Sequence, residues 1–229
     1  MRSAQWLRGS YLVRGLGHCN ACHGSRNLFG ATSEALELSG GLIPMQNWYA
    51  PSLTSSAEAG VANWSPQQVV ALLKTGKTDG ASVLGPMAEV VFRSTQYLTD
   101  ADLRAMAVFL IALPQSTAVH SAMASNTKPA DTALVRQGAE LYERHCAECH
   151  GAQGQGATGI YPALAGNRAV TLESPANLVR VVVSGGFLPA TAGNPRPFGM
   201  PPFGAVLKDA DIAAVVSFVR GSKSFTCGD

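Results

Sequence analysis

A five-residue motif that occurs twice constrains this 229-residue chain more than any other feature. Cys19-Asn20-Ala21-Cys22-His23 returns as Cys146-Ala147-Glu148-Cys149-His150. Two further segments recur in the same order, Ser65–Val70 as Ser174–Val179 and Thr99–Leu103 as Lys208–Ile212. Repeated segments in one order indicate an internal duplication, which fixes the domain count more firmly than length does.

The spacing of these repeats predicts the domain boundaries. The two cysteine motifs lie 127 residues apart, whereas both other repeats lie 109 residues apart, so the first half has 18 additional residues between His23 and Ser65. That stretch, from about 30 to 63, is rich in Gly, Ser, Thr and Pro and predicts an ordered loop. Residues 114–131 lack apolar periodicity, as expected of a linker. We therefore predict two domains, 1–124 and 125–229.

Each half is predicted to be all-α, with three helices. The leading helices have apolar residues at helical spacing. The middle helices begin with Ser-Pro, a cap followed by proline at the first helical position, and stop at Gly76 and Gly185. The last helices open with acidic residues that suit the positive end of the helix dipole. The expected ranges are about 5–16, 66–76 and 100–113 in the first half, and 132–148, 175–185 and 209–220 in the second.

Cys-x-x-Cys-His is the attachment signature of c-type haem, in which two thioethers hold the porphyrin and the histidine ligates the iron. On a helical turn, cysteines three positions apart share one face, and the next residue reaches under the same ring. The motifs therefore predict two covalent haem c groups. The expected attachment residues are Cys19, Cys22, Cys146 and Cys149, and the expected iron ligands are His23 and His150. A zinc site built from both cysteine pairs and a redox dithiol are the alternatives.

The second iron ligand is predicted to be methionine. Met87 and Met200 both lie between the middle and last helices, in segments flanked by glycine and proline that predict loops. Methionine is often core filler, and Met106, inside a predicted helix, fits that role. Met45, in another loop, is the rival to Met87 as ligand.

Composition excludes several other classes of protein. The 17 basic and 15 acidic residues are scattered, with no basic run that would follow a phosphate backbone, so no nucleic-acid partner is expected. The longest apolar stretches, such as 106–113, are too short to span a bilayer, so no transmembrane segment is expected. The first residues lack the apolar region of a secretory signal, and we expect a periplasmic protein whose signal has been removed.

The chain also resembles the cytochrome subunits of bacterial membrane-associated alcohol, gluconate and aldehyde dehydrogenases. The matching segments are Trp6–Leu12, the first cysteine motif, Ala50–Thr54, Trp64-Ser65, Asp79-Gly80, Gly85–Met87, Gly138–Tyr142, Tyr161–Asn167, Asn177-Leu178 and Met200–Phe203. This resemblance implies two tandem class I cytochrome c-like domains in which Tyr49, Trp64 and Pro162 line or buttress the haem pockets. Such subunits commonly carry three haems and a membrane-associating C-terminal segment, whereas this chain has two motifs, so a soluble or separately encoded partner is expected.

Histidine and methionine together fill both axial positions of an iron, which favours electron transfer over substrate chemistry. The expected function is to carry single electrons from a dehydrogenase to a downstream cytochrome or oxidase. The alternative is a dihaem enzyme, such as a cytochrome c peroxidase or a thiosulfate dehydrogenase, with an open, histidine or cysteine sixth position. Few residues are available for that position: His18, His120, His145 and Cys227.

Overall fold

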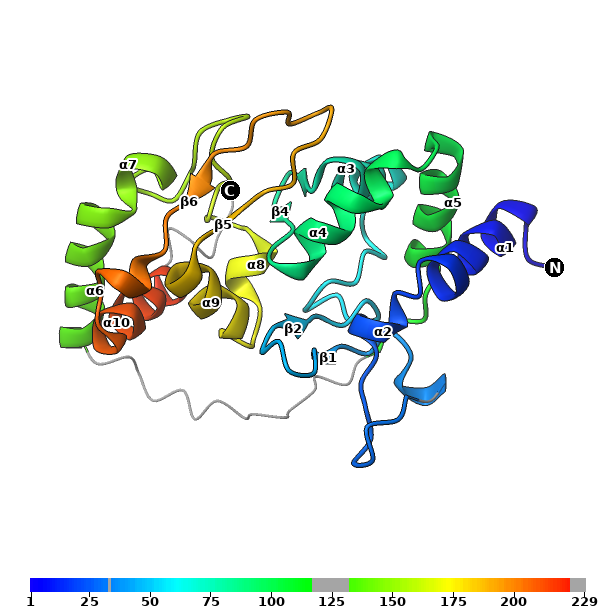
Figure 1. Cartoon of the computed structure of the whole chain (residues 1–229), viewed down its shortest axis with the longest axis horizontal. Helices are drawn as coiled ribbons and strands as arrows, with labels where there is room; N and C mark the ends of the chain where they lie inside the picture. The colour runs from blue at the N-terminus through cyan, green and yellow to red at the C-terminus, as the bar shows by residue number, and fades with distance from the viewer. Residues whose placement is uncertain (33, 117–131, 223–229) are drawn as a thin grey trace.

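The computed structural model describes residues 1–32, 34–116 and 132–222. The predicted boundary near residue 125, together with His120 and Cys227, lies outside the described residues. Figure 1 shows the two halves of the chain side by side, with the first half on the right. Among the described residues, no helix is long and apolar enough to cross a membrane.

Both halves are rich in helix, and each is framed by a pair of crossed helices. In the first half the elements are α1 (Ala4–Ser10), the π-helix η1 (Tyr11–Leu16), α2 (Asn20–His23), η2 (Glu34–Leu36), β1 (Gly41–Leu42), β2 (Tyr49–Ala50), α3 (Pro66–Thr75), β3 (Lys77–Thr78), β4 (Ala81–Ser82), α4 (Pro86–Arg93), η3 (Thr95–Tyr97) and α5 (Asp100–Ile111). In the second half they are α6 (Thr132–His145), α7 (Ala147–His150), α8 (Arg168–Thr171), α9 (Ala176–Ser184), β5 (Gly186–Phe187), β6 (Gly199–Met200), η4 (Phe203–Ala205) and α10 (Asp209–Gly221).

Glycine sets both helix crossings. α1 packs on α5 and α6 packs on α10. A Cβ at Gly9 would collide with the carbonyl of Ala105, and a Cβ at Gly138 would collide with the carbonyl of Ala214. The two contacts are equivalent in the repeat, so the same close approach of helices organises both halves.

A separate hydrophobic core lies behind each crossing. The first core includes Leu12, Val13, Val69, Leu103 and Phe109, and the second includes Leu141, Tyr142, Leu178, Ile212 and Val215. Each set draws only on its own half, as the duplication predicts.

The middle helices largely follow the prediction. α3 begins at Pro66 and ends at Thr75, and the next residue, Gly76, caps it with a left-handed φ of 80°. Ser65 and Gln68 form a reciprocal capping box at its start. α9 begins one residue later than expected, at Ala176, and the hydroxyl of Ser174 accepts only a long bond of 3.4 Å from the Ala176 amide.

The predicted leading helix of the first half consists of an α-helix followed directly by a π-helix. α1 continues as a π-helix from Tyr11 to Leu16. Ten positions separate Gly9 from Cys19, but only eight separate Gly138 from Cys146. A π-helix takes up additional residues within a continuous helical turn, so it accommodates this difference before the first cysteine motif.

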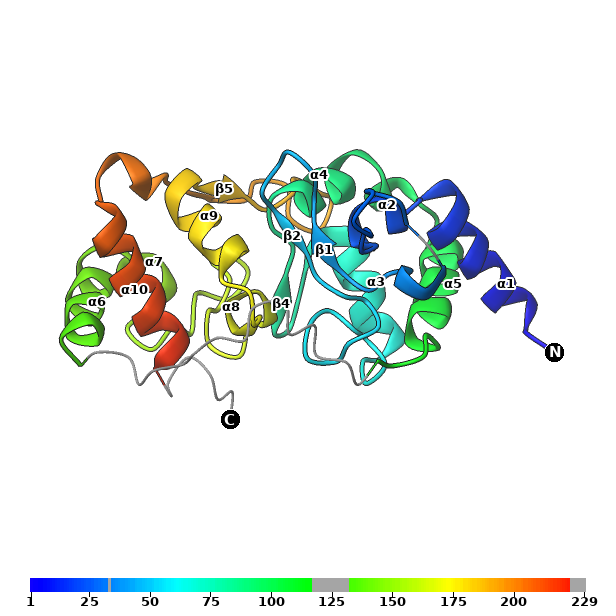
Figure 2. The same cartoon turned by 90° about the horizontal axis from the view of Figure 1, so that it is seen from below.

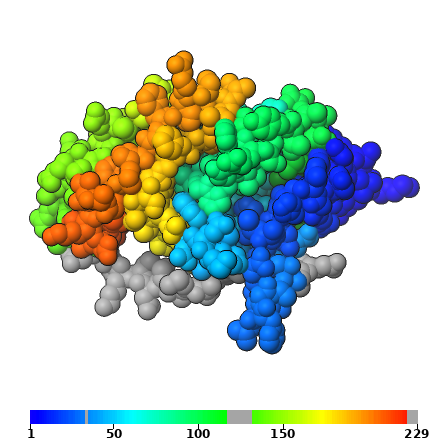
Figure 3. All heavy atoms as spheres, viewed as in Figure 1, coloured from blue at the N-terminus to red at the C-terminus, as the bar shows by residue number. Residues whose placement is uncertain are grey.

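The strands are short additions to the helical frame and were not predicted. Within the described residues, the strands form three antiparallel pairs, β1–β2, β3–β4 and β5–β6, with two residues in each strand. β1 and β2 lie in the 30–63 segment that was predicted as an ordered loop. The chain between α2 and β1 projects from the body of the molecule (Figure 3).

The halves contact each other through hydrogen bonds as well as packing. The buried amide of Asn177 in α9 donates to the Tyr49 carbonyl (2.7 Å) and accepts from the Tyr49 amide (2.9 Å). The Arg168 amide donates to the Gly80 carbonyl, at 3.1 Å. α8 therefore lies beside β4, as both Figure 1 and Figure 2 show.

Candidate functional site

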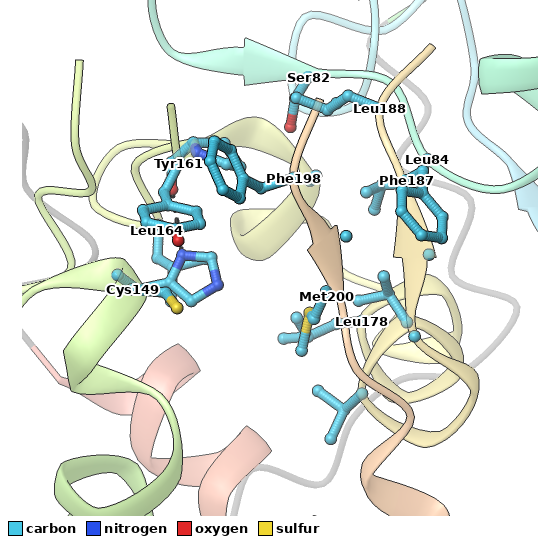
Figure 4. A pocket seen from close by; sticks show the side chains of 18 of the residues that line it. Ser82, Leu84, Cys149, Tyr161, Leu164, Leu178, Phe187, Leu188, Phe198 and Met200 are labelled. Carbon is cyan, nitrogen blue, oxygen red and sulfur yellow. Dashed lines mark hydrogen bonds between the residues drawn. The ribbon is translucent and has the colours of Figure 1, made fainter. Parts of the chain in front are cut away.

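A cavity of about 920 Å³ is lined mainly by the second half, and its wall contains every residue predicted to bind haem there. Those residues are Cys146, Cys149, His150, Pro162 and Met200. Cys149 comes from α7 and Met200 from β6, on opposite sides of the space (Figure 4). Leu178, Val182 and Val215 make much of the wall apolar.

A smaller cavity, of about 370 Å³, is lined mainly by the first half. Its wall contains all the residues predicted to bind haem in this half: Cys19, Cys22, His23, Tyr49, Trp64 and Met87. Both volumes fall in the usual range of about 300–1,000 Å³ for cofactor sites. The duplication of the sequence is thus also a duplication of cavities.

A proline carbonyl orients the histidine of each motif. Nδ1 of His23 lies 2.8 Å from the Pro51 carbonyl oxygen, and Nδ1 of His150 lies 3.1 Å from that of Pro162. Because a carbonyl oxygen only accepts, Nδ1 donates its hydrogen in both rings, which leaves Nε2 with a free lone pair. This is the usual arrangement of a metal-binding histidine and its outer partner.

Burial lowers the pKa of both histidines, and the proline carbonyl opposes this effect only in part. Both imidazoles are therefore neutral at neutral pH, the form that ligates a metal. Pro162 was a predicted pocket residue, whereas Pro51 was not, although it lies in the Ala50–Thr54 segment that carries the family resemblance. The equivalent place of these two prolines in the repeat was the signal that would have identified Pro51.

The cysteines lie at the start and inside of two four-residue helices, α2 and α7. Burial raises the pKa of Cys19 and of Cys146 to about 11, so both are neutral thiols rather than reactive thiolates. Each pair occupies the wall of its own cavity. The raised pKa values do not fit a redox dithiol, and the separate cavities do not fit a single zinc ion shared between the pairs.

The local structure around the methionines differs from the prediction of loops. Met87 is the second residue of helix α4, after Pro86 at the first position, and Met200 lies in strand β6 opposite Gly186. The loop prediction was wrong because it relied on glycine and proline, and proline at a helix start favours the helix. Gly85, with a φ of 48°, turns the chain into α4 against Trp48.

Met87 has one neighbouring methionine in the first cavity. Met45 is fully exposed and is not part of the cavity wall. Met106 is buried in the first core, as predicted, and also reaches the wall. The first cavity therefore offers two thioethers, of which only Met87 has a counterpart in the second cavity at the equivalent place, Met200.

The remaining predicted residues shape the first cavity. The Tyr49 hydroxyl donates to Oε2 of Glu58 at 2.8 Å, and the Ser52 amide donates to the same oxygen at 2.7 Å. The Arg168 guanidinium lies 4.9 Å from the centre of the Trp64 ring. His18 and His145 also border the cavities, His18 the first and His145 the second.

Each cavity thus has two thiols, a neutral imidazole with its Nδ1 already bound, at least one thioether and an apolar lining. Thiols suit covalent attachment to a porphyrin, and histidine and methionine are known axial ligands of haem iron. The apolar walls suit the flat, largely apolar ring. The residues present therefore fit a haem c in each cavity.

Residues 135–223 match the family model described as "Cytochrome c". They are a cytochrome c domain. It comprises α6 to α10 and contains the second cysteine motif, the second cavity and Met200. The helix-rich fold around this cavity agrees with that assignment.

Curated relatives extend beyond the cytochrome c domain to nearly the whole chain. The cytochrome c subunit of a quinone alcohol dehydrogenase from Gluconobacter oxydans is 40% identical over 93% of this chain and 46% of its own length. The cytochrome subunit of fructose dehydrogenase from Gluconobacter japonicus is 34% identical over 93% of this chain and 48% of its own. A diheme cytochrome c-type protein from Cereibacter sphaeroides is 40% identical over 47% of this chain and 35% of its own.

The chain spans about half the length of the dehydrogenase cytochrome subunits it matches. As predicted from the sequence, this chain is similar to the cytochrome c subunits of dehydrogenases. By their names, these relatives are the cytochrome subunits of the enzymes.

Proposed function

We propose that the chain is an electron-transfer protein that holds one haem c in each half. The observation that carries this proposal is the repeated cavity, with Cys-x-x-Cys-His on one side and a methionine from a distant segment on the other. The predicted domains, 1–124 and 125–229, would then be two tandem class I cytochrome c-like units. The two separate cores support this division.

In this proposal Cys19, Cys22, Cys146 and Cys149 attach the two groups. The bound haem supplies an iron that gains and loses one electron. His23 and His150 offer Nε2 because Pro51 and Pro162 hold Nδ1. Met87 and Met200 offer sulfur from the far walls, and sulfur favours the reduced iron.

If His23 with Met87 and His150 with Met200 held the two irons, neither half would leave a place for a substrate at the metal. The apolar walls keep water away from the ring. These features suit a carrier rather than a peroxidase or a thiosulfate dehydrogenase, each of which needs a different or open ligand position at one iron.

The partners follow from the relatives, which are named as cytochrome subunits of alcohol, fructose and gluconate dehydrogenases. We propose a dehydrogenase as electron donor and a downstream cytochrome or oxidase of the respiratory chain as acceptor. We also propose a periplasmic location. Co-purification with a dehydrogenase from the native host tests the donor.

An anaerobic redox titration followed by visible absorption tests the carrier function. We expect two one-electron waves, a methionine-to-iron band in the oxidised spectrum, and no spectral change when carbon monoxide is added to the reduced protein. Carbon monoxide binding to one iron, together with turnover of peroxide or thiosulfate, would instead establish the enzyme.

A further inference from the structure

One charged side chain crosses from the second half into the first cavity. Arg168 is the first residue of α8, yet it lines the cavity that holds Cys19, His23 and Met87. Its NH1 donates to the Gly60 carbonyl at 2.6 Å, and its guanidinium lies over the ring of Trp64. Both contact residues belong to the first half.

The position of Arg168 is fixed by its neighbours in α8. Asn167 caps this short helix through Oδ1, which accepts from the Ala169 amide at 3.0 Å. Nδ2 of Asn167 donates across to the hydroxyl of Ser82 in β4, at 3.2 Å. With the bond from the Arg168 amide to Gly80, these contacts fasten the start of α8 to the β3–β4 hairpin.

The charge of Arg168 is not matched within the part of the chain that the structure describes. Among the described residues, no carboxylate forms an ion pair with it. Glu58, on the same cavity wall, is already bound by Tyr49 and Ser52. The side chain is half-buried, and this burial alone lowers the pKa of Arg168. A guanidinium that has lost water without gaining an anion is unfavourable.

An anionic group in the first cavity would resolve this imbalance. Resting on the proposed function, we propose that Arg168 is the charge partner of the propionate groups of the haem held in the first half. A guanidinium presents a planar fork of N–H donors that matches a carboxylate. The second half would thereby help to hold the first haem and raise its reduction potential, since a nearby positive charge favours the reduced iron.

Arg180 provides a matched control. Its guanidinium also lies over a tryptophan of the first half, 5.3 Å from the ring centre of Trp48, but it is not part of either cavity wall. Arg168→Gln and Arg180→Gln therefore each remove one positive charge that lies over a tryptophan of the first half. Arg168→Lys keeps the charge and removes the fork.

The experiment is an optical redox titration of the whole haem-loaded chain and these three variants, after the two haems per chain have been counted. We expect Arg168→Gln to shift one wave to lower potential. The expected change is about tenfold in the ratio of reduced to oxidised iron at a given potential, which corresponds to about 59 mV for one electron. The other wave should stay in place, and Arg180→Gln should shift neither by more than a few-fold. The Met87→His variant, which moves the wave of the first haem, identifies it.

The proposal is wrong if Arg168→Gln leaves both waves unchanged or moves both by the same amount as Arg180→Gln. Should Arg168→Gln fail to load the first haem, Arg168→Lys decides. Because it keeps the charge, we expect it to load the first haem with a shift well below tenfold, and a failure to load or a shift of tenfold or more would contradict the proposal. A wild-type chain with no haem would reject the proposed function itself and is recognised in the initial count.

Discussion

The first half reaches its cavity with Met87 from the opening turn of a helix, whereas the second half reaches its cavity with Met200 from a short strand. The histidine side is the same in both, down to the proline carbonyl at Nδ1. The attachment side is therefore built locally by a contiguous motif. The methionine side depends on the segments between the middle and last helices, which differ in secondary structure but both bring a sulfur to the cavity wall.

The surroundings of the two cavities also differ. The first cavity receives Arg168, Ala169, Leu172 and Asn177 from the other half, while the second receives a larger and mostly apolar set that includes Val83, Leu84, Phe92 and Glu89. The charged member differs in sign, because Arg168 lines the first cavity and Glu89, which pairs with Arg93, lines the second. If each cavity holds a haem, these unlike surroundings would give the two irons different reduction potentials.

The largest expected effect concerns the methionines. Met87→Ala should abolish one of the two methionine-to-iron signals, and Met200→Ala the other, because each sulfur serves only its own cavity. Met106→Leu is the control in the first cavity, since it keeps the volume of the core. Near-infrared magnetic circular dichroism counts the signals. Loss of a signal in Met106→Leu with none in Met87→Ala would reverse the assignment.

Substitution of the crossing glycines should give the next largest effect. Gly9→Ala and Gly138→Ala should each destabilise their own half by about 3 kcal/mol, because the added Cβ meets a backbone carbonyl of the partner helix. Hydrogen exchange resolved by peptide measures each half separately.

The control for the glycines is Gly221→Ala, where no atom lies within 4 Å of the added Cβ. It should be neutral or stabilise α10 by up to about 1 kcal/mol. If Gly9→Ala lowered protection in α6 and α10 as much as in α1 and α5, the two halves would form one cooperative unit rather than two domains.

Substitution of the serines at the starts of the two middle helices should have smaller effects on stability. Ser65→Ala removes a full capping box and should cost about 1 kcal/mol. Ser174→Ala removes only the long bond to Ala176 and should cost ~0.3 kcal/mol. Chemical denaturation of both variants tests the difference, and equal costs would show that the two helix starts are equivalent in solution.

The smallest effect concerns the pairing of the crossed helices. Arg8 binds Asp102 at 2.8 Å in the first half, where the second half has Gln137 bound to Asp211 at the same distance. The hydrogen bond from Arg8 lowers the pKa of Asp102. A lowered carboxylate pKa contributes stability above the unfolded pKa and loses it as pH falls through the folded value.

Measuring the free energy of unfolding of the wild type and of Asp102→Asn between pH 7 and pH 2 tests this contribution of Asp102 to stability. The stability difference between them should shrink as pH falls and also in high salt, because the pair is exposed. A difference that grows on acidification would show that Asp102 acts through something other than its charge.

Much of this arrangement could be predicted because it is encoded locally. The cysteine motifs, the caps at Ser65 and the acidic starts of α5 and α10 are contiguous signals. The helix around Met87 was missed, since Pro86 marks a helix start as well as a loop. The roles of Pro51 and Arg168 depend on contacts across 28 and 108 residues of sequence, which no local pattern records.

The proposed function requires each half to hold its own covalent haem. Intact mass spectrometry of the whole chain, expressed with a cytochrome c maturation system, counts the haems directly. We expect two haems on the wild type and one on each of the variants Cys19→Ser/Cys22→Ser and Cys146→Ser/Cys149→Ser. A wild-type chain carrying one haem or none, or a single pair of substitutions that removes both, would contradict it.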